Sequence, residues 1–198
     1  MMRITIALVG TDGSGKTTFA NYLKKTLEAE GTSACVIFMG WRDFQNPVLR
    51  FISYYYKKLK IHEQKNEEKL ARFRSRSIFF YLLYYLELRM RYRNAVRCTA
   101  DVVVFDRYFY DELVFASPRL FRILKRFTPR PDLCVILKVL PSVLKKRGVS
   151  ISVEQYSRFY NSLRKVSLLS PTITIDTTKS LLKLYRSLQP DLTTLMGN

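Results

Sequence analysis

The sequence predicts a doubly wound α/β domain in which helices flank a five-stranded parallel sheet. Short apolar runs rich in β-branched residues alternate with longer helical segments, and the five runs are residues 3–9, 33–39, 101–106, 132–139 and 172–176. Continuous apolar runs of this kind are typical of strands that helices cover on both faces. The 198 residues suit one domain with a sizeable core, so we expect a single domain over residues 1–198.

The elements follow in a regular order. The first strand leads into a glycine-rich loop, and residues 17–31 follow as an amphipathic helix that ends at Gly31. Residues 57–76 are polar and rich in helix formers, which indicates an exposed helix or helix–loop–helix. Residues 75–96 predict a long helix whose apolar first half crosses the core. Its second half carries Arg89, Arg91 and Arg93, which we expect to emerge into solvent or toward an anion.

The charge of the chain is unusual. Thirty-four Lys and Arg stand against sixteen Asp and Glu, a formal net charge of +18. Such a field attracts nucleotides, nucleic acid or anionic membrane surfaces and does not choose among them. No apolar run approaches the roughly 18 residues of a membrane span. Three cysteines without metal-like spacing, in a chain that shows no signal peptide, favour reduced thiols and a cytoplasmic location.

The most specific segment is "GTDGSGKTT", residues 10–18, which satisfies the phosphate-binding pattern G-x-x-x-x-G-K-[ST]. It lies between a predicted strand and a predicted helix, the context that the pattern requires. Backbone N–H groups and the helix N-terminus would surround phosphate oxygens, Lys16 would reach the β- and γ-phosphates, and Thr17 would place its hydroxyl on Mg²⁺. The predicted ATP-binding residues are Gly10, Asp12, Gly13, Ser14, Gly15, Lys16, Thr17 and Thr18.

Two acidic positions suggest the other half of the site. Asp12 is costly inside a ring of phosphate-binding amides, so we expect it to point across the cleft toward the acceptor, for example a sugar hydroxyl; a loop-stabilising cap is the alternative. Asp106 and Arg107 end the third strand, at the sheet edge where ligands bind. Asp106 can hold Mg²⁺ through water, and Arg107 can bind an acceptor phosphate bidentately. Alternatively, this pair only ties strand to helix.

These residues resemble the thymidylate kinases and their relatives among the nucleoside monophosphate kinases. The family loop G-x-D-G-x-G-K-T-T and the strand-end motif D-R-Y/H match Gly10 to Thr18 and Asp106 to Tyr108, and the resemblance extends over the chain. It implies a P-loop NTPase fold of the nucleoside monophosphate kinase type, ATP and Mg²⁺ as cofactors, nucleotide substrates and a homodimer. By the same resemblance, Lys16, Arg107, Arg147 and Asp106 act in catalysis, and Asp12, Arg107 and Tyr108 bind the acceptor.

The resemblance also implies a lid, which we expect around residues 143–153 with Arg147 as its arginine, and an adenine site near Thr177 and Thr178. The chain departs from the family pattern where thymidylate kinases carry R-x-P-G-G-T. Here the sequence reads "FMGWRDFQNPV", and Arg42 is the candidate for the arginine's part in substrate binding.

The sequence leaves three alternative functions to be tested. The first is ATP- and Mg²⁺-dependent phosphoryl transfer to a nucleoside monophosphate, dTMP in the family. The second is a kinase for another phosphate-bearing or non-nucleotide acceptor. The third is a basic nucleic-acid-associated ATPase, which the sequence disfavours because basic residues are scattered and no second motor motif occurs, so no stable nucleic-acid partner is expected. Asp111 remains open between a sugar ligand and a helix cap.

Overall fold

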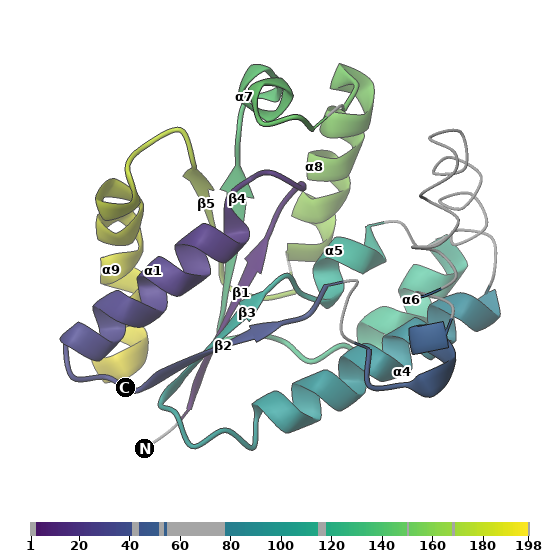
Figure 1. Ribbon diagram of the computed structural model, residues 1–198, viewed down its shortest axis with the longest axis horizontal. Helices are drawn as coiled ribbons and strands as arrows, with labels where there is room; N and C mark the ends of the chain where they lie inside the picture. The colour runs from purple at the N-terminus through teal and green to yellow at the C-terminus, as the bar shows by residue number, and fades with distance from the viewer. Residues whose placement is uncertain are drawn as a thin grey trace.

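The computed structural model describes residues 3–40, 44–51, 54, 78–114, 118–149, 151–167 and 169–197. Its centre is a five-stranded sheet in the order β2-β3-β1-β4-β5, in which every neighbouring pair is parallel (Figure 1). The strands are β1 (Ile4–Val9), β2 (Ala34–Phe38), β3 (Val102–Asp106), β4 (Leu133–Lys138) and β5 (Thr172–Asp176). The predicted doubly wound fold and its five strands are confirmed.

Helices cover both faces of this sheet. They are α1 (Lys16–Ala29), α4 (Ile78–Ala95), α5 (Phe109–Leu113), α6 (Pro118–Phe127), α7 (Pro141–Lys146), α8 (Val153–Ser167) and α9 (Leu181–Gly197). Ile6 and Leu8 of β1 pack in one core cluster with α1 and α9. Ala7 and Val9 pack in a second cluster with α4, α5, α6 and α8. The period-2 alternation of a strand thus buries both faces of β1, which explains its unbroken apolar sequence.

The register brings the ends of three strands to one place. Leu8 of β1 lies beside Asp106 of β3, and Phe38 of β2 lies on the other side of Asp106. The N–H of Arg107 donates to the Leu8 carbonyl at 3.1 Å, and the N–H of Met39 donates to the Asp106 carbonyl at 2.9 Å. The loop after β1, the end of β3 and residues 39–40 therefore meet at the carboxyl edge of the sheet, where open α/β sheets bind ligands.

Helix α4 differs from its prediction at one arginine. Tyr84, Tyr85 and Leu88 are buried, as the apolar half predicted. Arg93 is exposed, but Arg91 is buried and its Nε donates to Glu87 at 2.8 Å. Arg91 therefore does not emerge into solvent, because an acid one turn earlier pairs with it inside the fold. No described helix is long and apolar enough to cross a membrane. The polar helix predicted for residues 57–76 lies outside the described residues.

Candidate active site

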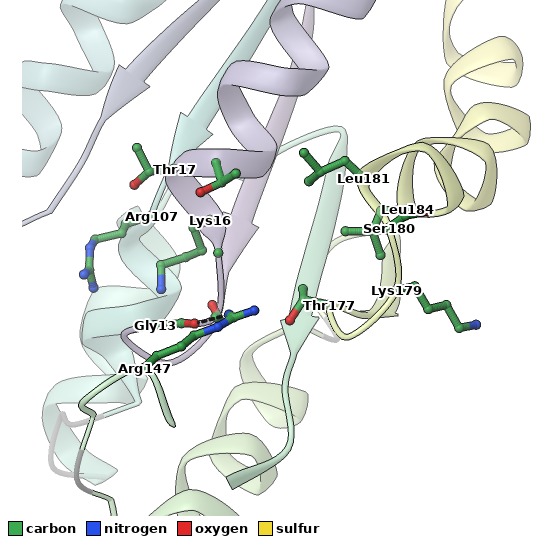
Figure 2. A pocket seen from close by; sticks show the side chains of 13 residues that line it. Gly13, Lys16, Thr17, Arg107, Arg147, Thr177, Lys179, Ser180, Leu181 and Leu184 are labelled. Atoms are coloured by element: carbon green, nitrogen blue, oxygen red, sulfur yellow. Dashed lines mark hydrogen bonds between the residues drawn. The ribbon is translucent and has the colours of Figure 1, made fainter. Parts of the chain in front are cut away.

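A cavity of about 640 Å³ lies at the carboxyl edge of the sheet, between the glycine-rich loop and the start of α9 (Figure 2). One side is formed by residues 13–18 of the loop and by Arg107. The other side is formed by Thr177, Ser180 and Leu181, which follow β5, and Arg147 reaches in from the end of α7. Loop, strand-end arginine, lid arginine and the turn after the last strand therefore converge on one hollow.

The loop can wrap a ligand because two glycines leave room that a side chain would fill. A Cβ at Gly10 would lie 2.6 Å from the Leu137 carbonyl oxygen on β4. Gly13 has a φ of +74°, and a Cβ there would lie 2.8 Å from Cγ2 of Val149, after α7. Helix α1 begins directly behind the loop at Lys16, so its first N–H groups have no partner within the helix and face the cavity end of the loop.

Lys16 is folded back onto the loop. Its Nζ donates to the carbonyl oxygens of Gly10 and Thr11, each at 2.7 Å, and its side chain is buried. Burial lowers the pKa of Lys16, and the carboxylate of Asp111 opposes that shift. In this conformation the ammonium group of Lys16 is hydrogen-bonded to two loop carbonyls. It lies at the wall of the cavity, where a phosphate oxygen could take the place of those carbonyls.

Thr17 and Asp106 form the oxygen pair that the sequence predicted for magnesium. The hydroxyl of Thr17 donates to Oδ2 of Asp106 at 2.6 Å. Oδ1 of Asp106 is buried and has no hydrogen-bond partner among the described residues. A buried carboxylate oxygen without a partner is costly unless something else binds it, and hard oxygen donors suit Mg²⁺. The pair fits a magnesium ion that takes its remaining ligands from water and phosphate.

Nothing else in the described part of the chain competes for that role. No group of three or more His, Cys, Asp or Glu side chains there could hold a metal. Magnesium in phosphoryl-transfer sites commonly takes only one or two protein ligands, with substrate phosphates as the others. A site built on Asp106 and Thr17 alone is consistent with that habit.

Arg107 directly follows Asp106 in the chain and bonds to the loop. Its Nη2 donates to Oδ1 of Asp12, and the two side chains form an ion pair. Arg107 has a φ of +72°, a backbone conformation that non-glycine residues rarely adopt. The carboxylate of Asp12 therefore pairs with Arg107, the residue predicted for the acceptor phosphate.

Gly40 makes room for that arginine. A Cβ at Gly40 would lie 2.5 Å from Cδ and 2.8 Å from Nε of Arg107. It would also lie 2.3 Å from the tip of the Phe38 ring. The segment after β2 thus approaches Arg107 too closely for any larger residue.

Asp111 bonds to the backbone of the glycine-rich loop. The sequence had left two roles open for this residue. It is fully enclosed; Oδ1 accepts the N–H of Gly10 at 3.0 Å, and Oδ2 accepts the N–H of Tyr108 at 3.2 Å. The second bond spans three residues at the start of α5, as in a helix capping box. Asp111 is therefore a helix cap that also fixes the phosphate-binding loop, and both its oxygens have backbone partners.

The buried carboxyl of Asp111 should make stability depend on pH. Burial raises its pKa to about 6, against the opposing charge of Lys16, the N–H of Gly10, and Arg107. The folded state then binds this proton more tightly than the unfolded state, so the free energy of unfolding falls as pH rises through the window from about 4 to about 6. The fall is roughly 2–3 kcal/mol at 1.36 kcal/mol per pKa unit.

Asp111→Asn removes this titration. The variant also loses one hydrogen bond, because the amide oxygen can still accept a backbone N–H but the amide nitrogen cannot. The free energy of that loss is the same at every pH. Urea unfolding of both proteins at pH 4.5, 5.5 and 7 measures the difference. We expect the wild type to lose about 2 kcal/mol relative to the variant between pH 4.5 and 7; a constant difference would contradict the assignment.

Arg147 lies at the carboxyl end of α7 and bonds to the loop. Its Nη1 donates to the Gly13 carbonyl at 2.5 Å, and the side chain crosses the cavity toward Thr177 (Figure 2). Lys145 and Lys146 are exposed beside it. Of the predicted lid, residues 143–146 belong to α7, and position 150 lies outside the described residues.

Comparison with known proteins agrees with this geometry. No protein-family profile matches the chain. A probable thymidylate kinase of Archaeoglobus fulgidus is 29% identical over 192 residues, which cover 89% of this chain and 88% of that protein. Probable thymidylate kinase 1 of Saccharolobus solfataricus is 24% identical over 143 residues, which cover 69% of this chain and 65% of that protein.

The fold has relatives among solved kinase structures. The crystal structure of thymidylate kinase from Ehrlichia chaffeensis matches 97% of this chain and all of that one, with a TM-score of 0.61 and 15% identity. Deoxyadenosine kinase from M. mycoides with bound dCTP matches 96% of this chain and all of that one, with a TM-score of 0.53 and 18% identity.

The chain is thus similar to probable thymidylate kinases over most of its length.

One residue that the family motif assigned to the acceptor lies elsewhere. Tyr108 is 1% exposed, and its hydroxyl donates to the Pro129 carbonyl at 3.0 Å. Its ring packs edge-on against Phe109 and Tyr110, whose centroids lie 5.2 Å away. The structure therefore places Tyr108 in the core and not in the cavity: with Arg107 at positive φ, the next side chain enters the core.

The other acceptor candidates have mixed outcomes. Arg42, together with Trp41, lies outside the described residues, so its role stays a prediction. Arg89, which the sequence placed toward solvent or an anion, donates from Nη1 to the Phe127 carbonyl at 2.9 Å and thus faces α6. Thr177 lines the cavity as expected. The hydroxyl and N–H of Thr178 instead bond to Asp176.

Sequence reasoning missed two sets of site residues. The far side of the cavity is lined by Lys179, Ser180, Leu181 and Leu184, and no pattern in the sequence marked them. The buried pair of Glu87 and Arg91 holds the segment around Gly40. Its signal was visible as an acid and a base spaced i, i+4 within an apolar helix, where an ion pair is the simplest way to bury both charges.

Proposed function

We propose that this protein transfers a phosphoryl group from ATP to a nucleoside monophosphate, with dTMP as the first acceptor to test and dTDP as the product. The observation that carries the proposal is the Thr17–Asp106 pair with its unpartnered carboxylate oxygen, beside Lys16 in the cavity. The printed names of the relatives support thymidylate as the acceptor.

The donor half of the site lies in the cavity. The N–H groups of the loop and of the first turn of α1 would bind the phosphates of ATP, and Lys16 would leave the Gly10 and Thr11 carbonyls to pair with them. Asp106 and Thr17 would hold Mg²⁺, which neutralises charge that develops on the phosphates. Arg147 would close over them as part of a lid at residues 143–153 and exclude water, which suppresses hydrolysis of ATP.

The acceptor half lies beyond Arg107. The guanidinium is already oriented by Asp12, so an acceptor phosphate that approaches from that side would meet a fixed bidentate donor. An acceptor phosphate is itself anionic and needs little help from a general base, so positioning and positive charge supply the catalysis. Arg42 remains the candidate for a second phosphate ligand.

A coupled assay of ADP release with Mg-ATP tests the proposal. The panel is dTMP, dUMP, dCMP, dGMP, dAMP and the four ribonucleotides. We expect turnover with dTMP well above that of the others and above ATP alone. Turnover with another monophosphate would keep the reaction and change the acceptor, whereas no acceleration by any of them would contradict a nucleoside monophosphate kinase.

A kinase for a different phosphate-bearing acceptor is the second candidate. One observation favours it: the chain reads Gly40-Trp41-Arg42-Asp43-Phe44 where the family pattern has Pro-Gly-Gly. Binding of ATP in the absence of turnover with the panel would support it.

A homodimer remains a prediction of the family resemblance. The molar mass from light scattering tests it, with twice 23.3 kDa as the expected value.

Asp106→Asn should weaken magnesium binding while the protein stays folded. The amide keeps the shape but loses the charge, so we expect the magnesium concentration for half-maximal rate to rise and kcat to fall roughly 10²-fold. A magnesium titration of ADP release measures both, with Glu154→Gln, an exposed charge loss on α8, as the matched control. Unchanged magnesium dependence would contradict the assigned role.

A further inference from the structure

Two of the three cysteines lie close together near the amino ends of the strands, and neither lines the cavity. Cys35 is the second residue of β2 and packs against the core cluster that contains Ala95, the last residue of α4. Cys98 follows that helix, and its N–H donates to the Ala95 carbonyl at 3.0 Å. Both are free, partly exposed thiols, whereas Cys134 is buried in β4.

Hydrogen bonds join the two chain segments that carry this pair. The N–H of Val102 donates to the Ser33 carbonyl at 3.0 Å, and the N–H of Asp101 donates to Oγ of Ser33 at 2.9 Å. That hydroxyl donates in turn to Oδ2 of Asp101 at 2.6 Å. Ser33 lies two positions before Cys35, and Asp101 lies three positions after Cys98. The backbone therefore fixes the two cysteines relative to each other.

The two thiols have unlike environments. The backbone N–H of Ala100 lowers the pKa of Cys98, as do a hydrogen bond from the Cys35 thiol and the charge of Arg3. Nε of Arg3 donates to the Ala100 carbonyl at 3.2 Å, which holds the guanidinium beside this turn. Burial raises the pKa of Cys35, and the hydrogen bond to Cys98 adds to the rise. Cys98 is thus the nucleophilic member of the pair, and Cys35 is the protonated one.

We propose that Cys35 and Cys98 form a redox modification site, at which hydrogen peroxide converts the two thiols into a reversible intramolecular disulfide. The Cys98 thiolate attacks one peroxide oxygen: an S–O bond forms, the O–O bond breaks, and the leaving hydroxide takes a proton to become water. The Cys35 sulfur then attacks the Cys98 sulfur. The S–S bond forms, the S–O bond breaks, and the Cys35 proton leaves with the hydroxide as a second water. The two sulfurs lose two electrons, which reduce the peroxide.

The disulfide would close a ring around the acceptor side of the molecule. β2 leads into Gly40, and α4 carries Glu87 and Arg91, so both ends of the ring lie on elements that hold this segment. A cross-link between residues far apart in the chain stabilises a protein mainly by restricting its unfolded state. The oxidised protein should therefore resist unfolding better than the reduced protein.

A zinc site at this pair fits less well than a disulfide. Structural zinc takes four ligands, and the described residues place no third His, Cys, Asp or Glu with the two thiols. The inference does not depend on the phosphoryl transfer proposed above, because its tests read out thiols and unfolding alone.

Thiol counting on the full chain tests the proposal. The protein is reduced, freed of reductant, treated with about a tenfold excess of hydrogen peroxide and alkylated. We expect two of the three thiols to escape alkylation, a peptide map that links Cys35 to Cys98, and complete reversal by dithiothreitol. Urea unfolding of both forms should show a higher midpoint for the oxidised chain. An unchanged or lower midpoint would overturn the idea that the fold accepts the bond.

Single substitutions assign the two roles. Cys98→Ser should slow the loss of thiols about tenfold or more, because the remaining Cys35 thiol has a raised pKa. Cys35→Ser should leave Cys98 as a sulfenic acid that dimedone traps. Cys134→Ser is the matched control and should oxidise at the wild-type rate within about twofold, since Cys134 is buried away from the pair. Circular dichroism of each reduced variant checks that it is folded.

Four results would overturn the proposal. One is a wild-type chain whose three thiols all stay open to alkylation after peroxide treatment. Another is a peptide map in which Cys134 takes part in the bond. The third is a disulfide that joins two chains, seen as a doubled mass on a non-reducing gel. The last is equal slowing of oxidation by Cys134→Ser and Cys98→Ser, which would mean that the low pKa of Cys98 has no part in the reaction.

Discussion

Lys16→Met should lower kcat about a thousandfold while the protein stays folded. The methionine fills the space of the lysine stem inside the loop, but it supplies no charge to a phosphoryl group in transfer. The bonds of Nζ to the Gly10 and Thr11 carbonyls are also lost. That loss is partly offset because a buried cation, whose pKa burial already lowers, is removed. We therefore expect a large kinetic effect with a small change in thermal midpoint.

The rate of ADP release and the circular dichroism melt measure the two effects. Lys179→Met is the matched control, because Lys179 also lines the cavity but its side chain points away from it in Figure 2. We expect the control to keep its rate within about threefold, as exposed substitutions usually do. A Lys16→Met protein that retains a tenth of the wild-type rate would show that the loop acts without its lysine.

Glu87→Ala should have the largest effect on stability. The carboxylate is completely buried and accepts three hydrogen bonds, from the N–H groups of Gln45 and Asn46 and from Nε of Arg91. Its removal takes the Glu87 carboxylate from the buried Arg91 guanidinium, and breaking such a buried pair costs roughly 3–5 kcal/mol. Urea unfolding measures the loss. Glu87→Ala/Arg91→Met removes both charges and should recover part of it, which a purely local cavity effect would not.

Loss of the Glu87 charge should also weaken binding of the acceptor. Arg91 donates to the carbonyl of Gly40 at 3.0 Å and stacks on the Phe44 ring at 5.3 Å, so the pair holds both ends of the segment after β2. We expect KM for the acceptor to rise in Glu87→Gln, while KM for ATP changes little because the donor cavity lies elsewhere. Equal changes in both KM values would mean that the pair only supports the fold.

The sequence predicted the features that are local along the chain. The five strands are correct within a residue at each end because β-branched apolar runs depend on neighbours only. The phosphate-binding loop was visible because glycines, lysine and threonine stand at fixed spacing. Thr17 and Asp106 could be paired in advance, although 89 positions separate them, because parallel strands bring their carboxyl ends to one edge.

The missed features depend on how distant segments pack. Asp111 reaches Gly10 across 101 positions, and Gln45 reaches Glu87 across 42. Periodicity gives the face of a helix but not the backbone that will lie against it. Tyr108 was misplaced for a related reason: the motif fixed its position in the chain, whereas the positive φ of the residue before it fixed its direction. Arg91 was misplaced because charge alone was taken to mean solvent.

Both backbone polar groups of Gly10 have side-chain partners. Its N–H donates to Asp111, and its carbonyl accepts from Lys16. In the proposed reaction these loop carbonyls therefore compete with the nucleotide phosphates for Lys16. The lysine must release two backbone oxygens before it can bind a phosphate. The observed affinity is the intrinsic affinity scaled by the fraction of molecules in which the lysine has turned outward. A single phosphate or sulfate ion offers too few contacts to drive that exchange, whereas a triphosphate offers many. Under the proposed function we therefore expect the loop to bind long polyphosphates in preference to phosphate or sulfate, because Lys16 already has two carbonyl partners in the empty loop.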